Sequence, residues 1–236
     1  NPAEPNGSLA RIAVESGQVL ERRVIQGPSG QRLPNDFVFE AGGARILAAQ
    51  LSNYPAEPVR TELQTIDAAS ATVTSSRTID GWLDGLARHP VNGKLWGTYL
   101  TPGDSQRKLV RVNWAQGKVQ ILGGLPPELF PRGLAFTPDG SELWALLGHN
   151  QPYPEGLLRL NPNNGEILAQ LPWTLPDSPL ALEFDLQGRL LVYAYDGRIY
   201  SVDRAGGATV LVSTVANPIQ YIITGWGPSP ATADQR

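Results

Sequence analysis

Three carboxylates stand within short apolar runs, where charged side chains are rare. They are Asp36 in NDFVF, Asp84 in WLDGLA and Glu183 in LALEF. Two chemistries suit such acids: glycoside hydrolysis by two carboxyl groups about 5–9.5 Å apart, and coordination of a hard cation such as Ca²⁺ by oxygen ligands. The structural alternative is that Glu183 is a buried carboxylate paired with an arginine such as Arg132.

A second set of candidates carries amides, phenols and indoles in stretches rich in Pro and Gly. Such side chains combine flat apolar faces with hydrogen-bonding edges, which suits the recognition of sugars and extended peptides. The same residue types also form turns and pack between structural units. The candidate ligand-binding residues are Asn53, Tyr54, Trp82, Asp104, His149, Asn150, Tyr153 and Trp173.

Several other chemistries lack the residues they need. The chain has no cysteine, so it has no disulfide, thiolate nucleophile or thiolate metal site. Its two histidines are His89, for which a turn position predicts a structural role, and His149. No spacing supports a Ser/His/Asp grouping, and GPSG (27–30) and GWGP (225–228) lack phosphate-binding patterns. We expect no metal and no resident cofactor.

The overall charge and hydropathy narrow the range of partners. The 236 residues contain 19 Lys and Arg against 22 Asp and Glu, a net charge of −3. An acidic chain is a poor match for phosphate backbones, so we expect no nucleic acid partner. No apolar stretch approaches the ~20 residues that span a bilayer, so we expect no membrane insertion. The opening NPAEPNGS resembles what remains after removal of a signal peptide, which predicts a secreted or periplasmic protein.

A repeated phrase predicts the elements that position these residues. FPRGLAFTPDGSELWALLG (130–148) recurs 48 residues earlier as WLDGLARHPVNGKLWGTYL and 48 residues later as SPLALEFDLQGRLLVYAYD. Each copy reads as an apolar strand, a turn containing Pro or Gly, and a returning apolar strand, which is a β-hairpin. NDFVFEAGGARILAAQL fits one interval earlier. No window sustains a helical period.

A second hairpin phrase lies between the first ones and occurs five times. Its copies are RIAVESGQVL (11–20), TIDAASATVT (65–74), RVNWAQGKVQ (111–120), RLNPNNGEIL (159–168) and SVDRAGGATV (201–210). The first copy has no inner hairpin before it, and IQYIITGW (219–226) reads as an inner strand with no outer partner. Four-stranded units of roughly 40–50 residues are the blades of propellers.

The two incomplete units complement each other, so the repeat predicts an all-β fold, a five-bladed β-propeller closed by strands from both termini. Joining the first blade to the last covers the sheet edge that an open array would expose. We expect an N-terminal extension (1–8), a single β-propeller domain (9–227) and a C-terminal tail (228–236).

The blade phrases also resemble a known superfamily. LAFTPDGSELWAL followed by GLLRLNPNNGEIL is similar to blades of the NHL, YVTN and gluconolactonase-like propellers, and the resemblance covers nearly the whole chain at the level of blade pattern. Because such propellers include lactonases, dehydrogenases and binding modules, the resemblance implies a fold and no single activity. Its lactonases imply a divalent cation held by Glu, Asn and Asp at the channel mouth. Glu183, Asp36 and Asn35 are the nearest candidates here, although no acidic residue is evident in the last blade.

The propeller arrangement predicts where the candidates gather. Loops from the second to the third strand of each blade emerge on one face, together with the loops between blades; we call this the loop face. Three such loops are long (51–60, 100–108 and 148–156), whereas the fourth is only YDGR (195–198). Because strand side chains alternate, Asp36 and Glu183 are expected to share a face while Asp84 points away.

The sequence therefore predicts an exported propeller that acts as a binding or interaction module. Its partner is a small molecule, a glycan, a peptide or a protein, recognised through the loop face. The alternative is a hydrolase of lactonase or glycosidase type that uses Glu183 and Asp36 at the central channel, with Ca²⁺ as its possible cofactor.

Overall fold

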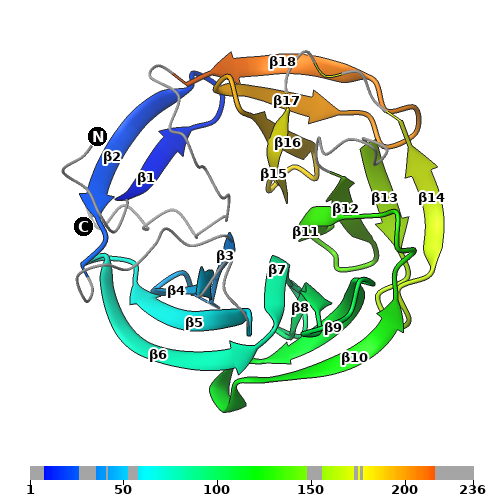
Figure 1. The fold of residues 1–236 in the computed structure, drawn as a ribbon. Coiled ribbons are helices and arrows are strands. Elements are labelled where there is room, and N and C mark those ends of the chain that lie inside the picture. The colour runs from blue at the N-terminus through cyan, green and yellow to red at the C-terminus, as the bar shows by residue number, and fades with distance from the viewer. Residues whose placement is uncertain are drawn as a thin grey trace.

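Four four-stranded antiparallel sheets stand around a central axis, and a two-stranded sheet fills the remaining sector of the ring (Figure 1). The computed structural model describes residues 8–26, 36–40, 42–52, 58–147, 156–172, 175 and 178–215. Within these ranges all elements are strands except a single 3₁₀ turn, η1 (Trp114–Gln116). The predicted all-β propeller is confirmed.

Each blade is a meander of four consecutive strands, with the first strand at the channel and the last at the rim. From the channel outward, the four blades are β3 (Asp36–Phe39), β4 (Arg45–Ser52), β5 (Arg60–Asp67) and β6 (Thr72–Asp80); β7 (Trp82–Arg88), β8 (Leu95–Leu100), β9 (Lys108–Asn113) and β10 (Lys118–Gly124); β11 (Pro131–Phe136), β12 (Leu143–Leu147), β13 (Gly156–Leu160) and β14 (Ile167–Leu171); and β15 (Pro179–Phe184), β16 (Leu190–Ala194), β17 (Arg198–Val202) and β18 (Thr209–Thr214). All of the repeated hairpins within these blades lie where the sequence predicts them.

The number of blades corrects the prediction: the described residues form four complete blades, not five. The remaining sheet pairs only β1 (Ser8–Ala13) with β2 (Gln18–Val24), which is the first copy of the outer hairpin. The strand predicted at 219–226 to complete this sheet lies outside the described residues. A strand prediction depends on local pattern, whereas the completion of a sheet depends on pairing between the two ends of the chain.

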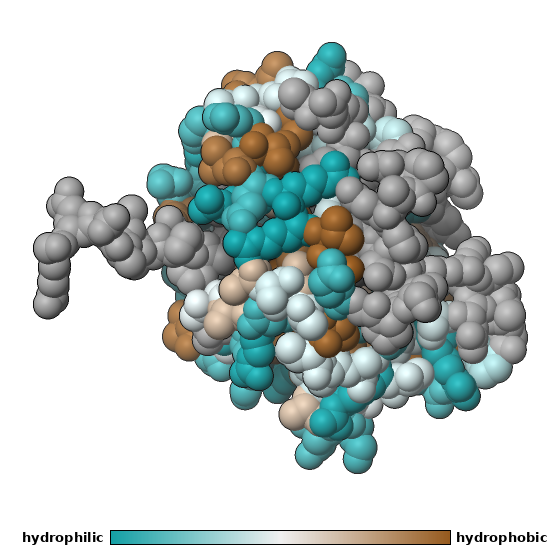
Figure 2. Space-filling view, turned by 90° about the vertical axis from the view of Figure 1, so that its left-hand side faces the viewer, coloured by the Kyte–Doolittle hydropathy of each residue, from teal (hydrophilic) through white to brown (hydrophobic). Residues whose placement is uncertain are grey.

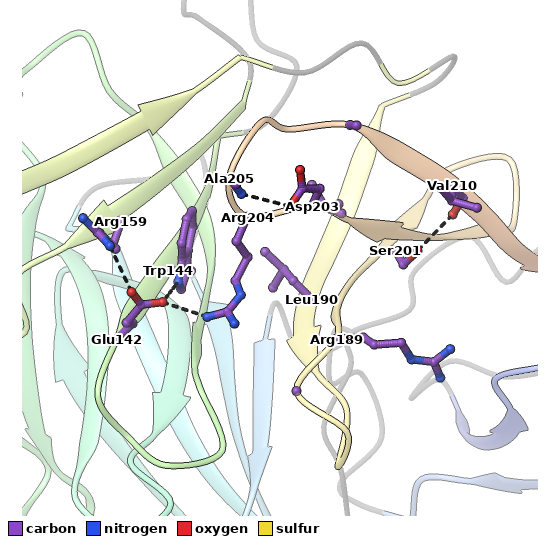
Figure 3. A pocket seen from close by; sticks show the side chains of 13 residues that line it. Glu142, Trp144, Arg159, Arg189, Leu190, Ser201, Asp203, Arg204, Ala205 and Val210 are labelled. Carbon is purple, nitrogen blue, oxygen red and sulfur yellow. Dashed lines mark hydrogen bonds and ion pairs between the residues drawn. The ribbon is translucent and has the colours of Figure 1, made fainter.

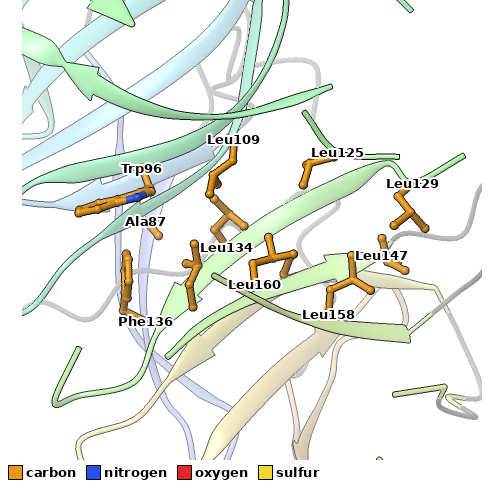
Figure 4. Packing of buried hydrophobic residues seen from close by; sticks show 12 residues of the cluster. Ala87, Trp96, Leu109, Leu125, Leu129, Leu134, Phe136, Leu147, Leu158 and Leu160 are labelled. Carbon is orange, nitrogen blue, oxygen red and sulfur yellow. The ribbon is translucent and has the colours of Figure 1, made fainter. Parts of the chain in front are cut away.

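Apolar clusters between neighbouring sheets hold the ring together. The cluster between the second and third blades joins Trp96 and Leu109 of one blade to Leu134, Phe136 and Leu158 of the next (Figure 4). Similar clusters lie at the other two boundaries between complete blades. Apolar area removed from water in this way stabilises the fold by roughly 25 cal/mol per Å².

The two-stranded sheet packs against a complete blade on each side. Ile12 and Val14 contact the cluster of Tyr193 and Ile199 in the last blade, whereas Leu9 packs against the cluster of the first blade. Figure 2 views the ring from this side, where small apolar groups are interspersed among hydrophilic residues. The ring is therefore continuous through the sector that holds only two described strands.

Candidate functional site

Only part of the sequence-predicted binding surface lies within the described residues. Trp82 and Asp104 are described, as are the alternative catalytic residues Asp36 and Glu183. The candidates outside the described residues are Asn53, Tyr54, His149, Asn150, Tyr153 and Trp173, together with Asn35 of the implied calcium site.

The loops of the loop face differ in length as the sequence predicts. Seven residues (53–59) separate β4 from β5, seven (101–107) separate β8 from β9, and eight (148–155) separate β12 from β13. Only three (195–197) separate β16 from β17. The connections from the second to the third strand are therefore long in three blades and short in the fourth.

Trp82 packs against other side chains of this face. Its ring meets Phe130 edge-on, with the two centroids 5.9 Å apart. The Arg107 guanidinium carbon lies 4.7 Å from the Trp82 centroid and 3.7 Å from the Phe130 centroid. Trp82 is the first residue of β7 and Phe130 directly precedes β11, so both lie where one blade passes to the next. Together they hold one arginine, and cation–π attraction strengthens this packing.

Arg107 is the side chain that the sequence analysis did not identify. It is 1% exposed, and its Nη2 lies 3.7 Å from Asp84 Oδ2. Its Nη1 donates a long hydrogen bond of 3.4 Å to the Thr98 hydroxyl. In sequence, Arg107 is one polar residue in a polar loop, and only the long-range approach of β7 to that loop indicates its role.

Asp84 is positioned by a β-bulge, and this corrects its predicted orientation. Gly85 adopts a φ of 56°, and the register shifts between Asp84 and Ala87. The extra residue places Asp84 opposite Thr98 of β8 in the ladder. Counted from the hairpin turn, this is the same ladder position at which Asp36 lies opposite Ala49 in the first blade. Asp84 therefore does not point away from Asp36, and the negative charge of Asp84 raises the pKa of Asp36.

Asp36 connects two blades. Its Oδ1 accepts a hydrogen bond of 2.8 Å from the Phe37 amide, and its Oδ2 accepts one from the Leu86 amide in the bulge of the next blade. A bulge leaves a backbone N–H without a ladder partner, and Asp36 supplies that partner. Burial raises the pKa of Asp36 well above its usual value, and the charges of Asp84 and Glu183 raise it further. Both oxygens of Asp36 are therefore engaged in structure.

Glu183 has a different environment. Its Oε1 accepts a hydrogen bond of 3.0 Å from the Phe184 amide, and burial raises its pKa to about 8. Within the described part of the chain no arginine forms an ion pair with Glu183, so the predicted pairing with Arg132 is not observed. Glu183 is partly exposed and lines a cavity of about 330 Å³ at the end of the channel opposite the loop face.

The positions of Glu183 and Asp36 do not favour a catalytic pair. Phe39 and Phe184 each form the last ladder pair before a hairpin turn, so Asp36 lies two residues further from the turn than Glu183 does. Two residues of a strand correspond to about 7 Å. The two-stranded sheet also separates their blades. Among the described residues, no group of three or more His, Asp and Glu is arranged to hold a metal ion. The calcium site that the resemblance implies also includes Asn35, which lies outside the described residues.

Asp104 has local partners. Its Oδ2 accepts a hydrogen bond of 2.6 Å from the Lys108 ammonium group, and its Oδ1 accepts one of 3.0 Å from the Gln106 amide. These bonds lower the pKa of Asp104. Because the carboxylate shapes its own loop in this way, it has a structural role whether or not it also contacts a ligand.

A cleft of about 650 Å³ lies between the outer parts of the third and fourth blades (Figure 3). Glu142 accepts hydrogen bonds from the Trp144 indole, Arg159 and Arg204, at 3.0, 3.0 and 2.8 Å. Burial opposes ionisation of Glu142, but these donors outweigh it and lower the pKa. Arg204 belongs to the fourth blade, so the charged groups of this cleft tie neighbouring blades together.

Comparisons with known proteins address the fold. No family model and no curated protein matches the chain. Among solved structures, a putative TolB from Agrobacterium tumefaciens is 14% identical with a TM-score of 0.56, over 88% of this chain and 74% of the other. A protein of unknown function from Bacteroides caccae is 14% identical with a TM-score of 0.51, over 86% and 68%.

A third match is the β-propeller domain of Cps50 (Swd1) from Myceliophteria thermophila, 17% identical with a TM-score of 0.51 over 85% of this chain. The chain spans only 60% of that domain's length. Likeness at such low identity concerns fold and carries no activity. Among the described residues no helix is long and apolar enough to cross a bilayer. The chain shares the β-propeller fold with these proteins, and its place among the NHL, YVTN or gluconolactonase-like families stays a prediction.

Proposed function

We propose that this protein is a binding module that recognises a carbohydrate, peptide or protein partner through the loop face. The observation that carries the proposal is the asymmetry of that face, where loops of seven, seven and eight residues stand beside one of three. Loops on a rigid scaffold are common sites of recognition.

The base of this face is built to stay in place. Trp82 and Phe130 hold Arg107, which reaches Asp84 beneath them. A preorganised base reduces the conformational entropy that binding costs. The sequences of the long loops contain Tyr and Asn residues, whose few rotatable bonds make them efficient contact residues. Action outside the cytoplasm is part of this proposal.

A glycan array and a peptide array, each probed with the full chain with and without added Ca²⁺, test the proposal. Tyr153→Ala and Trp173→Ala are expected to weaken binding of any hit at least tenfold and to leave the melting temperature nearly unchanged. The control is Val91→Ala, because Val91 is 74% exposed and lies in a hairpin turn at the opposite end of the channel.

Equal binding by all three variants would place the ligand elsewhere. A large loss of stability in Tyr153→Ala and Trp173→Ala would show that these rings belong to the core. Binding that requires Ca²⁺ and survives both substitutions would favour a site at the channel over the loop face.

A further inference from the structure

The cavity beside Glu183 is distinct from the loop face. It lies where the first strands of the blades end and their hairpin turns begin, at the opposite end of the channel. Its volume of about 330 Å³ is within the range of small-molecule sites. About half of its wall is apolar, and Val38 of the first blade, Leu134 and Phe136 of the third and Phe184 of the fourth contribute to it. Such a wall suits the apolar body of a small ligand.

Glu183 differs from the other charged groups of the cavity. The others are held by neighbours: Glu40 by Arg45 at 2.5 Å, Asp185 by Arg189 at 2.5 Å, and Arg88 through its Nε to the Gly93 carbonyl at 3.3 Å. In the part of the chain that the structure describes, Glu183 receives one backbone hydrogen bond and no cation. Among the described residues that line the cavity, Glu183 is therefore the carboxyl group without an ion-pair partner, and Arg88 is the cation that lies in the same wall.

The neighbouring electrostatics favour an incoming cation. Asp36, deeper along the channel, is close enough for the charge of Glu183 to raise its pKa. Ionisation of Glu183 is opposed by burial, which leaves the pKa at about 8. A cation beside Glu183 would stabilise the ionised carboxylate, whereas an anion would meet both acids.

We propose that this cavity binds a small primary amine, whose ammonium group pairs with the Glu183 carboxylate while its apolar body packs against Val38, Leu134 and Phe136. This site is independent of the loop face. Arg88 at the wall disfavours dications, so a single ammonium group is the expected charge.

Binding at pH 7 must release a proton. The free site holds Glu183 largely protonated, and the complex needs the carboxylate, so the proton passes to the buffer. An alkylammonium group keeps its own proton to about pH 10. The ionised fraction of a group with a pKa of about 8 rises about tenfold between pH 7 and pH 9. Affinity should rise by about the same factor over that interval.

Isothermal titration calorimetry with hexylamine, 1-hexanol and hexanoate tests this site in the full chain. Hexylamine is expected to bind, tenfold more tightly at pH 9 than at pH 7, with proton release that changes the apparent enthalpy between buffers. The uncharged and anionic probes are expected to bind at least tenfold more weakly. Glu183→Gln is expected to lose at least tenfold in hexylamine affinity, whereas Glu128→Gln, an exposed acid away from the cavity, is expected to lose none.

Two results would overturn the proposal. One is hexanol binding as tightly as hexylamine, or affinity that falls as the pH rises, because Glu183 would then act as a neutral donor. The other is no measurable hexylamine binding at pH 9. If Glu183→Gln does not fold, an NMR titration of the Glu183 carboxyl in the unmodified chain decides the matter. Saturating hexylamine should lower its pKa, and an unchanged value would contradict the site.

Discussion

Glu183 makes a prediction at the scale of a single residue. Its pKa is raised by burial to about 8 in the folded chain, from an ordinary value of 4.5. The folded state therefore retains a proton that the unfolded state has released, and stability from this group falls as the pH rises from about 4.5 to about 8. A shift of one pKa unit corresponds to about 1.4 kcal/mol of unfolding free energy. Because Glu183 is partly exposed, solvent screening reduces the expected total loss of stability to about 3 kcal/mol.

Urea unfolding at pH 5 and pH 8 measures this effect. The unmodified chain should lose about 3 kcal/mol more than Glu183→Gln between the two values, because the amide does not titrate. Asp36, whose pKa is raised mainly by burial and then by Asp84, contributes to both proteins and cancels in the comparison except for the smaller effect of the Glu183 charge on it. An equal loss in the two proteins would show that Glu183 is ordinarily solvated.

The same residues show how far the sequence predicts individual side chains. The apolar runs around Asp36, Asp84 and Glu183 correctly indicate buried or partly buried carboxylates at the channel. The orientation of Asp84 was wrong, because a strict alternation of side chains takes no account of a bulge. The glycine at position 85 was visible in the sequence, but glycine in a strand also has other causes. The partner of Asp84, Arg107, is unpredictable because the contact joins two segments that only the folded blade brings together.

At the scale of elements, the Arg107–Asp84 pair fastens the loop before β9 to the bulged strand β7. Removing Arg107 takes the stronger of two positive charges away from buried Asp84 and leaves only that of Arg132, at a cost of about 3 kcal/mol. Arg107→Met keeps the apolar stem between Trp82 and Phe130 and removes the charge. It is expected to destabilise the protein by that amount at pH 7 in urea unfolding.

A double-mutant cycle separates the pair from the packing. Asp84→Asn added to Arg107→Met should recover at least 1 kcal/mol of the loss, since no charge is then left unpaired. Arg77→Met is the control, because Arg77 is exposed on the outer strand β6. Additive effects of the two substitutions would mean that the ion pair is unimportant and that only the aromatic packing matters.

Strands and hairpins of this chain are predictable because their signals are local. Alternating apolar runs and turn residues fix each hairpin, and copies at a constant interval confirm one another. The number of complete blades is a different kind of property. It depends on pairing between segments from opposite ends of the chain, and the pattern of the segments alone does not determine that pairing.

At the scale of the whole molecule, the contact between the two-stranded sheet and the last blade closes the ring. Gly17, in the turn between β1 and β2, has a φ of 69°, and a Cβ added there would lie 2.1 Å from the Thr214 carbonyl oxygen in β18. Nearby, the Ser213 hydroxyl donates a hydrogen bond to the Val14 carbonyl. An alanine at position 17 must therefore separate the sheet from the blade in addition to straining the turn.

Gly188→Ala isolates the strain, because Gly188 has a φ of 78° and no atom within 4 Å of the added Cβ. That substitution should cost about 1 kcal/mol, and Gly17→Ala should cost at least twice as much. Hydrogen exchange should locate the difference: amides of β1 and β18 should exchange faster in Gly17→Ala, while those of β9 and β10 on the far side of the ring stay protected. Equal costs with unchanged exchange in β18 would mean that the ring does not depend on this contact, and that the four complete blades hold their curvature through the clusters between them.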